Sequence, residues 1–255
     1  MASNRKTPVQ KREEFEDTQQ HAAKHLPVVS NALKIKLEQL RTIEPFTDNQ
    51  GKFFDAYGNG GEAFVLAGSA GSGKSHIGLY LALKDVLTKE TPYKKVIIVR
   101  SSVSVRSPGH LPGSVNEKFA IYELPYKQIC AELFGRKDAY DRLVEQGYIE
   151  FASTSFLRGL TFNDSIVFAD EQQNSNWSEL FTLCSRHGIR SKLILCGDSK
   201  QNDLLYHRND QSGFEDFMKV AESMKEFSII KFTTDDIIRS GFCKNFIIAC
   251  EKLGL

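Results

Sequence analysis

Five short apolar runs recur between residues 62 and 232, separated by polar segments that contain most of the glycines. The runs are rich in β-branched residues and do not alternate with polar positions, which is typical of strands buried on both faces of a sheet. Segments with helical spacing lie between most of them, so the pattern predicts an α/β fold with a parallel sheet and helices on both faces. The runs are AFVLA (63–67), KVIIV (95–99), SIVFA (165–169), KLILC (192–196) and FSIIKF (227–232).

The chain before the first run has a different character. Residues 1–20 are charged and poor in apolar side chains, which predicts a mobile tail. SNALKIKLEQL (30–40) favours a helix, and PFTDNQGKFFDAY (45–57) predicts another with Asp48 as its N-cap. The expected organisation is an N-terminal extension, partly flexible and then helical (1–44), and one α/β domain (45–255).

The composition indicates where the protein is located more than what it does. With 255 residues, 41% of them hydrophobic, the chain can form one sizeable core. A net charge of +1 gives no global field that favours nucleic acid, although a local basic groove can still form. No apolar stretch approaches the ~20 residues of a membrane span, and the polar N-terminus lacks the core of a signal peptide. Five scattered cysteines without a C-x-x-C pair predict reduced thiols and a cytoplasmic location.

The most specific motif is GSAGSGKS (68–75), which follows the first apolar run and fits the phosphate-binding pattern G-x-x-x-x-G-K-[ST]. Its backbone N–H groups converge on phosphate oxygens, and a helix beginning near Lys74 adds its positive end. Lys74 is expected to reach the β- and γ-phosphates, and the Ser75 hydroxyl to ligate Mg²⁺. The predicted nucleotide-binding residues of this segment are Gly68, Ser69, Ala70, Gly71, Ser72, Gly73, Lys74, Ser75 and His76.

Two later runs end in polar residues that suit nucleotide hydrolysis. In FADEQQN, Asp170 follows the strand and is placed to hold Mg²⁺, and Glu171 is placed to accept a proton from the attacking water. These acids could instead cap the helix that follows. In GDSKQNDL, Gln201 could contact the γ-phosphate or orient the water, and an ordinary polar loop is the alternative.

These motifs together resemble the PhoH family, P-loop ATPases similar to the first motor domain of superfamily 1 helicases. The resemblance covers about residues 45–252 and implies a RecA-like fold, ATP and ADP as ligands and Mg²⁺ as cofactor. The short stand-alone form resembles versions encoded by bacteriophages, which implies the host cytoplasm. The matching segments are TDNQGKFFDA, GSAGSGKS, VRSSVSVRSPGHLPGSVNEK, FLRGLTF, FADEQQN, GDSKQNDL, SGF (212–214) and DDIIRSGFCKNFIIACEKL.

The resemblance also implies roles for single residues. Gln50 resembles the glutamine that reads the adenine edge, with a helix-surface position as the alternative. Arg239 matches an arginine near the C-terminus and is the candidate arginine finger, unless it pairs locally with Asp235 or Asp236. The chain departs from the family pattern at several other positions, but none of them is Lys74, Asp170 or Glu171. The candidate nucleic-acid contacts are Arg100, Arg106, Lys118 and Arg158.

Two functions remain open at this stage. The first is an ATPase motor on single-stranded RNA or DNA, binding through phosphate contacts because no aromatic ladder is evident. Superfamily 1 helicases use two motor domains, so this hypothesis expects a homo-oligomeric ring, preferably a hexamer, in which Arg239 reaches the next subunit. The second is an ATP-gated switch that regulates a protein partner with slow turnover. A small-molecule kinase fits less well because Glu171 and Gln201 suit water activation.

Overall fold

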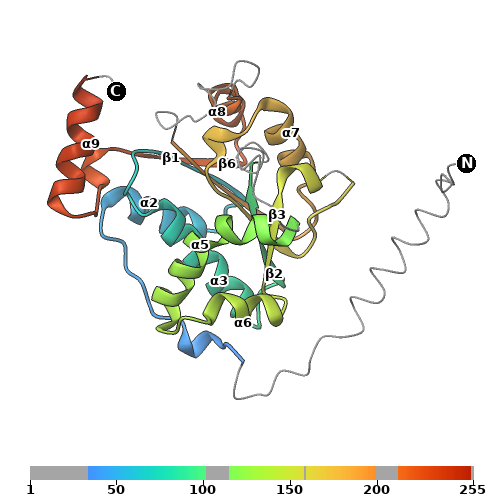
Figure 1. The fold of residues 1–255 in the computed structure, drawn as a ribbon. Coiled ribbons are helices and arrows are strands. Elements are labelled where there is room, and N and C mark those ends of the chain that lie inside the picture. Colours follow the sequence, from blue (N-terminus) through green and yellow to red (C-terminus); the bar gives the residue numbers. More distant parts are fainter. Residues whose placement is uncertain (1–33, 102–114, 158, 199–211, 254–255) are drawn as a thin grey trace, which may run out of the picture. The chain divides into compact units, whose positions relative to one another are not determined.

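Six parallel strands form the sheet that organises this protein (Figure 1). The structure, a computed structural model, describes residues 34–101, 115–157, 159–198 and 212–253, without the side chains of 115–119 and 156. The strand order is β3-β2-β4-β5-β1-β6, and each of the five pairings is parallel. The strands are β1 (Ala63–Gly68), β2 (Lys95–Arg100), β3 (Ile149–Ser153), β4 (Ser165–Ala169), β5 (Lys192–Gly197) and β6 (Phe227–Phe232).

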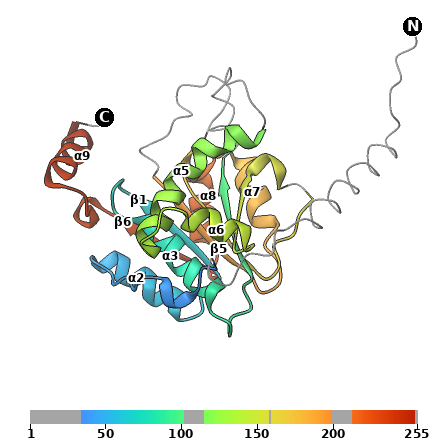
Figure 2. The same cartoon turned by 60° about the horizontal axis from the view of Figure 1, so that its bottom comes forward.

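Helices cover both faces of the sheet, as the apolar runs predicted (Figure 2). In β1, Phe64 and Leu66 belong to the apolar core that contains residues of α2, α3, α5 and α6, whereas Ala63 and Val65 belong to the core that contains residues of α7 and α8. With an apolar layer on each face, a central strand has no polar side, which explains its unbroken hydrophobic run. The helices are α2 (Asp48–Gly58), α3 (Lys74–Leu87), α5 (Val115–Phe134), α6 (Ala139–Glu145), α7 (Trp177–Ser185), α8 (Phe214–Glu222) and α9 (Gly241–Leu253).

The sequence pattern missed β3, which lies at one edge of the sheet. Its residues IEFAS include the exposed Glu150, whose carboxylate pairs with Lys95 of β2. This five-residue strand at the sheet edge is interrupted by a charged residue, so it lacks the continuous apolar run by which the other five strands, including the second edge strand β6, were recognised. The remaining strands lie where the sequence placed them, to within one residue.

The helix predicted over residues 30–40 is wrong for the described part of that range. Residues 37–39 form only a 3₁₀ helix. Ile35 is buried, and its N–H donates to Oε1 of Gln146 at 3.1 Å, so this backbone group bonds to α6's C-cap residue and not within a helix of its own. The N-cap of α2 also differs by one residue: Thr47, not Asp48, accepts from the N–H of Gln50.

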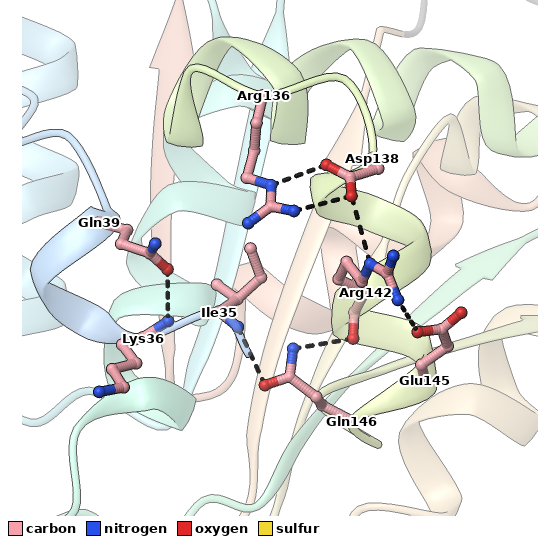
Figure 3. A network of polar contacts seen from close by, with 8 residues as sticks. All are labelled: Ile35, Lys36, Gln39, Arg136, Asp138, Arg142, Glu145 and Gln146. Atoms are coloured by element: carbon pink, nitrogen blue, oxygen red, sulfur yellow. Dashed lines mark hydrogen bonds and ion pairs between the residues drawn. The ribbon is translucent and has the colours of Figure 1, made fainter. Parts of the chain in front are cut away.

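A polar network holds residues 35–41 against α5 and α6 (Figure 3). Asp138 accepts from Arg136 and Arg142, and the hydrogen bonds of these two guanidinium groups hold the pKa of its carboxyl below its usual range. The N–H of Arg41 donates to the carbonyl of Leu133 at 2.9 Å. This anchoring fixes the direction of the next residues, 42–46, which run to the cavity described below.

For the cysteines and helices of the described residues, the sequence predicted free thiols and no membrane-spanning helix. All five cysteines are free thiols; Cys130 and Cys196 are buried and the other three are half-buried. Within the described ranges, no helix combines the length and the apolar character that crossing a bilayer requires.

Gly213 joins the two helices on the second face of the sheet. Its N–H donates to the carbonyl of Ser175 at 2.9 Å, one residue before α8 begins. A Cβ at this position would lie 2.3 Å from the backbone nitrogen of Trp177, the first residue of α7. The close approach of the two helix starts therefore requires a residue without a side chain.

We expect Gly213→Ala to lower the free energy of unfolding by about 1–3 kcal/mol. The new methyl group would overlap the backbone of Trp177, which cannot move without shifting α7. Gly58→Ala is the matched control, since Gly58 ends α2 and a Cβ there has nothing within 4 Å. Thermal denaturation followed by circular dichroism measures both. Equal melting temperatures for the two variants would show that the α7–α8 contact tolerates a side chain.

Candidate nucleotide-binding site

A cavity of about 680 Å³ opens where the carboxyl ends of β1, β4 and β5 meet the start of α3. This volume is within the usual range for small-molecule sites. Of the predicted site residues, the cavity is lined by Gln50, Ala70, Gly71, Gly73, Lys74, Ser75, His76, Arg100, Asp170, Glu171 and Arg239. The fold therefore brings together residues from five separate motifs.

The P-loop, residues 68–75, contains glycines in left-handed conformations. Gly71 and Gly73 have φ of +75° and +81°, left-handed values that glycine adopts at little cost. Gly73 is the N-cap of α3, so the helix begins at Lys74 as predicted, and the residues of its first turn, 74–77, line the cavity. Gly68, Ser69 and Ser72 do not line the cavity.

The side chains that do not line the cavity hold the loop in shape. Ser72 Oγ donates to the carbonyl of Ser69 at 2.8 Å, and Ser69 Oγ donates to Glu251 of α9 at 2.9 Å. A Cβ on Gly68 would lie 2.0 Å from the carbonyl oxygen of Phe232 in β6. Gly68 thus permits the close packing of β1 on β6 at the point where the loop begins.

Lys74 crosses the P-loop from the first turn of α3. Its Nζ donates to the carbonyls of Gly68 at 2.7 Å and of Ser69 at 2.8 Å. Burial lowers the pKa of the ammonium group, and the nearby carboxylates of Asp198, Asp170 and Glu171 act in the opposite direction. The amine therefore lies close to three carboxylates that line the same cavity.

Ser75 and Asp170, the two residues expected to hold Mg²⁺, are in direct contact. Ser75 Oγ donates to Oδ1 of Asp170 at 2.9 Å, and Tyr126 Oη donates to Oδ2 at 3.1 Å. Burial raises the pKa of the Asp170 carboxyl, and the charge of Glu171 adds to this effect. Tyr126 is itself fully buried, and burial followed by the Asp170 charge raises its pKa well above 10.

The donor set at Ser75 and Asp170 fits Mg²⁺, which takes oxygen ligands and keeps several waters or phosphate oxygens. Among the residues with described positions, no group of three His, Cys, Asp or Glu side chains could hold a metal by itself. A cation here would depend on the phosphates of a bound nucleotide for its remaining ligands.

Glu171 lines the cavity with an unusual backbone. Its φ of +55° is left-handed, and its carboxylate accepts from Nε2 of Gln173 at 2.6 Å. Gln173 also accepts from the N–H of Asp198 at 3.1 Å, so it ties Glu171 to the end of β5. The alternative that these acids cap the next helix is wrong: Glu171 precedes the 3₁₀ helix Gln172–Asn174, but its side chain makes no capping hydrogen bond there, and the N-cap of α7 is Asn176.

Gln50 is wholly buried, so the helix-surface alternative is also wrong. Its Oε1 accepts from the N–H of Phe46 at 2.8 Å, and its Nε2 donates to the carbonyl of Ser72 at 2.9 Å. The amide thereby connects residues 42–46 to the P-loop. One amide hydrogen and one lone pair of the side chain remain for a ligand.

Arg239 lies at the P-loop of its own chain, although the sequence argument expected it to reach a neighbouring subunit. A Cβ on Gly71 would lie 2.9 Å from Cγ of Arg239, and the N–H of Ile238 donates to the carbonyl of Gly71 at 3.2 Å. The carboxylate of Asp236 accepts from Asn49 at 2.8 Å. This segment therefore packs around the P-loop from β6.

Arg100, predicted as a nucleic-acid contact, lies instead in the wall of the nucleotide cavity. Its Nη1 donates to Oη of Tyr126 at 3.4 Å, so it belongs to the surroundings of Asp170. Three other predicted residues, Arg106, Arg158 and Gln201, lie outside the described residues, as does the side chain of Lys118.

Sequence reasoning missed one wall of the cavity. It is formed by residues 42–46 and by one face of α5, which includes Ile129 and Glu132. Glu132 lies 3.6 Å from Nε2 of His76, whose pKa burial lowers. These segments carry no local motif, whereas Gln173 stands inside FADEQQN and could have been chosen from the sequence.

Comparison with known proteins gives a family and several relatives. The family model described as "PhoH-like protein" matches residues 42–251. The PhoH-like protein of Bacillus subtilis is 31% identical over 186 residues, covering 72% of this chain and 57% of that protein. Protein PhoH of Escherichia coli is 30% identical over 190 residues, covering 74% and 52%. The chain thus spans little more than half the length of these relatives.

Solved structures resemble the chain only distantly. A large terminase from a thermophilic bacteriophage has a TM-score of 0.47 and 13% identity, covering 80% of this chain and 50% of that one. Unliganded Pif1 from Bacteroides sp has a TM-score of 0.37 and 17% identity, covering 78% and 43%. Likeness at this level adds nothing on function. The family match is different, because it includes the P-loop, Asp170 and Glu171 within one continuous range, and the chain belongs to the PhoH-like protein family.

Proposed function

We propose that this P-loop protein binds ATP with Mg²⁺ in the described cavity and hydrolyses it. The observation that carries the proposal is the contact of Ser75 Oγ with Oδ1 of Asp170 at 2.9 Å, in a cavity also lined by Lys74 and Glu171. Phosphate-binding loop, cation ligands and proton acceptor are thereby at one place.

Each residue has a separate task in this proposal. The P-loop N–H groups and the ammonium of Lys74 bind the phosphate oxygens, for which Lys74 exchanges its bonds to two loop carbonyls. Ser75 and Asp170 would hold Mg²⁺, which supplies charge neutralisation on the β- and γ-phosphates when bound. Glu171 takes a proton from water, with its carboxylate oriented by Gln173.

Gln50 supports ATP as the nucleotide. The amide hydrogen and the lone pair that it has left match the N7 acceptor and the N6 donor of adenine. The protein bonds of the same amide to Phe46 and Ser72 set its orientation, so adenine would meet a donor and an acceptor already in place.

Two substitutions separate binding from hydrolysis. Lys74→Ala removes a charge from the phosphates and is expected to weaken nucleotide binding by about 10–100-fold. Glu171→Gln keeps the shape of the side chain but loses the proton acceptor, so turnover should fall by about 10²–10⁴ while binding stays close to normal. A fluorescent nucleotide measures binding, and phosphate release measures turnover.

The control for these variants is Lys84→Ala, an exposed lysine on the same helix, α3, away from the cavity. It should leave both measurements unchanged. Normal turnover in Glu171→Gln would mean that Glu171 has only a structural role.

We further propose that the ATPase acts on single-stranded RNA or DNA. The support is the motif set that resembles superfamily 1 helicases, together with the basic residues Arg106, Lys118 and Arg158, which the sequence predicts near the loops. The alternative is an ATP-gated switch for a protein partner, in which nucleic acid has no effect on turnover.

Single-stranded RNA or DNA should stimulate ATP hydrolysis and bind mainly through its phosphates. The logarithm of the affinity should then fall linearly with the logarithm of the salt concentration, with a slope of about −0.7 for each phosphate contact. Fluorescence anisotropy of labelled oligonucleotides at rising salt measures this slope. Absence of both binding and stimulation would favour the switch.

Assembly into a homo-oligomer, most simply a hexameric ring, is a further part of the proposal. Helix α9 has no buried residue, and both figures show it apart from the helical layers (Figures 1 and 2). Its apolar side chains are open to solvent: Phe242 is 83% exposed, Phe246 61% and Leu253 73%. Such a face is suited to contact with another subunit.

Light scattering should therefore give a mass several times that of one chain. Replacing both Phe242 and Phe246 by Ser should reduce the mass to that of a monomer, because the apolar contact is removed. The monomer should keep its basal ATP hydrolysis, since Arg239 lies at the P-loop of its own chain. A monomeric wild-type protein with full turnover would rule out the ring.

A further inference from the structure

Both carboxylate oxygens of Asp170 are held by side chains from other elements. Ser75 of α3 donates to Oδ1, and Tyr126 of α5 donates to Oδ2 at 3.1 Å. With 4% of its surface exposed, Asp170 has little water to replace either bond. The hydroxyl of Tyr126 is therefore a fixed part of the surroundings of this carboxylate.

The direction of the Tyr126 hydroxyl is determined by Arg100. Nη1 of Arg100 donates to Tyr126 Oη at 3.4 Å, and a guanidinium group can only donate. The phenolic oxygen accepts that bond, so its single proton points to Asp170. The ring itself is packed between Phe151 and Phe168, with centroid distances of 6.0 and 6.3 Å, and cannot swing aside.

We propose that Tyr126 is a positioning residue, which keeps Asp170 turned toward Ser75 for binding of a Mg²⁺–nucleotide complex. The inference rests on the nucleotide site proposed above. If the hydroxyl is removed, Oδ2 loses a partner in a buried place and the carboxylate can rotate away from Ser75. Loss of a hydrogen-bond partner behind a metal ligand commonly weakens metal binding or activity by about 10–100-fold.

Tyr126→Phe tests this, because the variant keeps the packed ring and removes only the hydroxyl. The probe is a fluorescent ADP analogue, titrated into the protein in EDTA and then at rising Mg²⁺. We expect the dissociation constant in EDTA to be unchanged, since phosphate contacts remain. The Mg²⁺ concentration at half-effect should rise by about tenfold.

The chain offers a matched control in Tyr140→Phe. Tyr140 is buried in the same core, and its hydroxyl has no hydrogen-bond partner among the described residues. Its removal should leave the Mg²⁺ response unchanged. A second comparison uses Asp170→Asn: because Tyr126 acts through Asp170, adding Tyr126→Phe to Asp170→Asn should change nothing further.

The outcomes separate this inference from the proposed function. If the wild-type protein shows no Mg²⁺-dependent nucleotide binding, the proposed function fails and the role of Tyr126 with it. If the wild type responds to Mg²⁺ and Tyr126→Phe responds equally, only the positioning role is overturned. A loss of binding that is equal in EDTA and in Mg²⁺, with a lower melting temperature, would show a packing role and overturn it as well.

Discussion

The common direction of the six strands is the constraint on which the site depends. Because every pairing in the sheet is parallel, the carboxyl ends of β1, β4 and β5 lie along one edge. The P-loop, Asp170 and Asp198 follow these three strands, so residues far apart in the chain meet there. Parallel pairing requires long crossover connections, and the helices of these connections cover both faces of the sheet. Parallel pairing thus accounts both for the apolar core on each face of the sheet and for the polar site at the carboxyl ends of its strands.

The sequence predicted those parts of the fold and the site that depend on local pattern. The four strands inside the sheet and β6 at its other edge have apolar runs that could be recognised, whereas the edge strand β3 is interrupted by the exposed Glu150 and could not. The P-loop and the pair Asp170–Glu171 follow such strands directly, and their positions are confirmed. The helix expected before residue 45 failed for another reason: the backbone N–H of Ile35 bonds to α6's C-cap residue, which no local pattern reveals.

The remainder of the site depends on contacts between distant segments. Arg100 follows a strand and is basic, which suits a nucleic-acid contact, but its side chain is directed to Tyr126. Tyr126 lies 44 residues from Asp170 in a helix without a recognised motif. Gln50 was identified in another way. The family resemblance assigned it a role, but only the structure shows the hydrogen bonds to Phe46 and Ser72 that orient its side chain.

The left-handed backbone of Glu171 has a consequence for how this protein can change. That conformation costs a residue with a side chain about 1 kcal/mol or more, and glycine would adopt it freely. The turn is held by its neighbours: Gln172 Nε2 donates to the carbonyl of Asp170 at 2.9 Å, and the N–H of Asn174 donates to that of Glu171 at 3.1 Å. Selection for a more stable fold and selection for a carboxylate in the cavity therefore oppose each other at this one position. A screen for stabilised variants would favour Glu171→Gly, and this substitution removes the carboxylate on which the proposed hydrolysis depends.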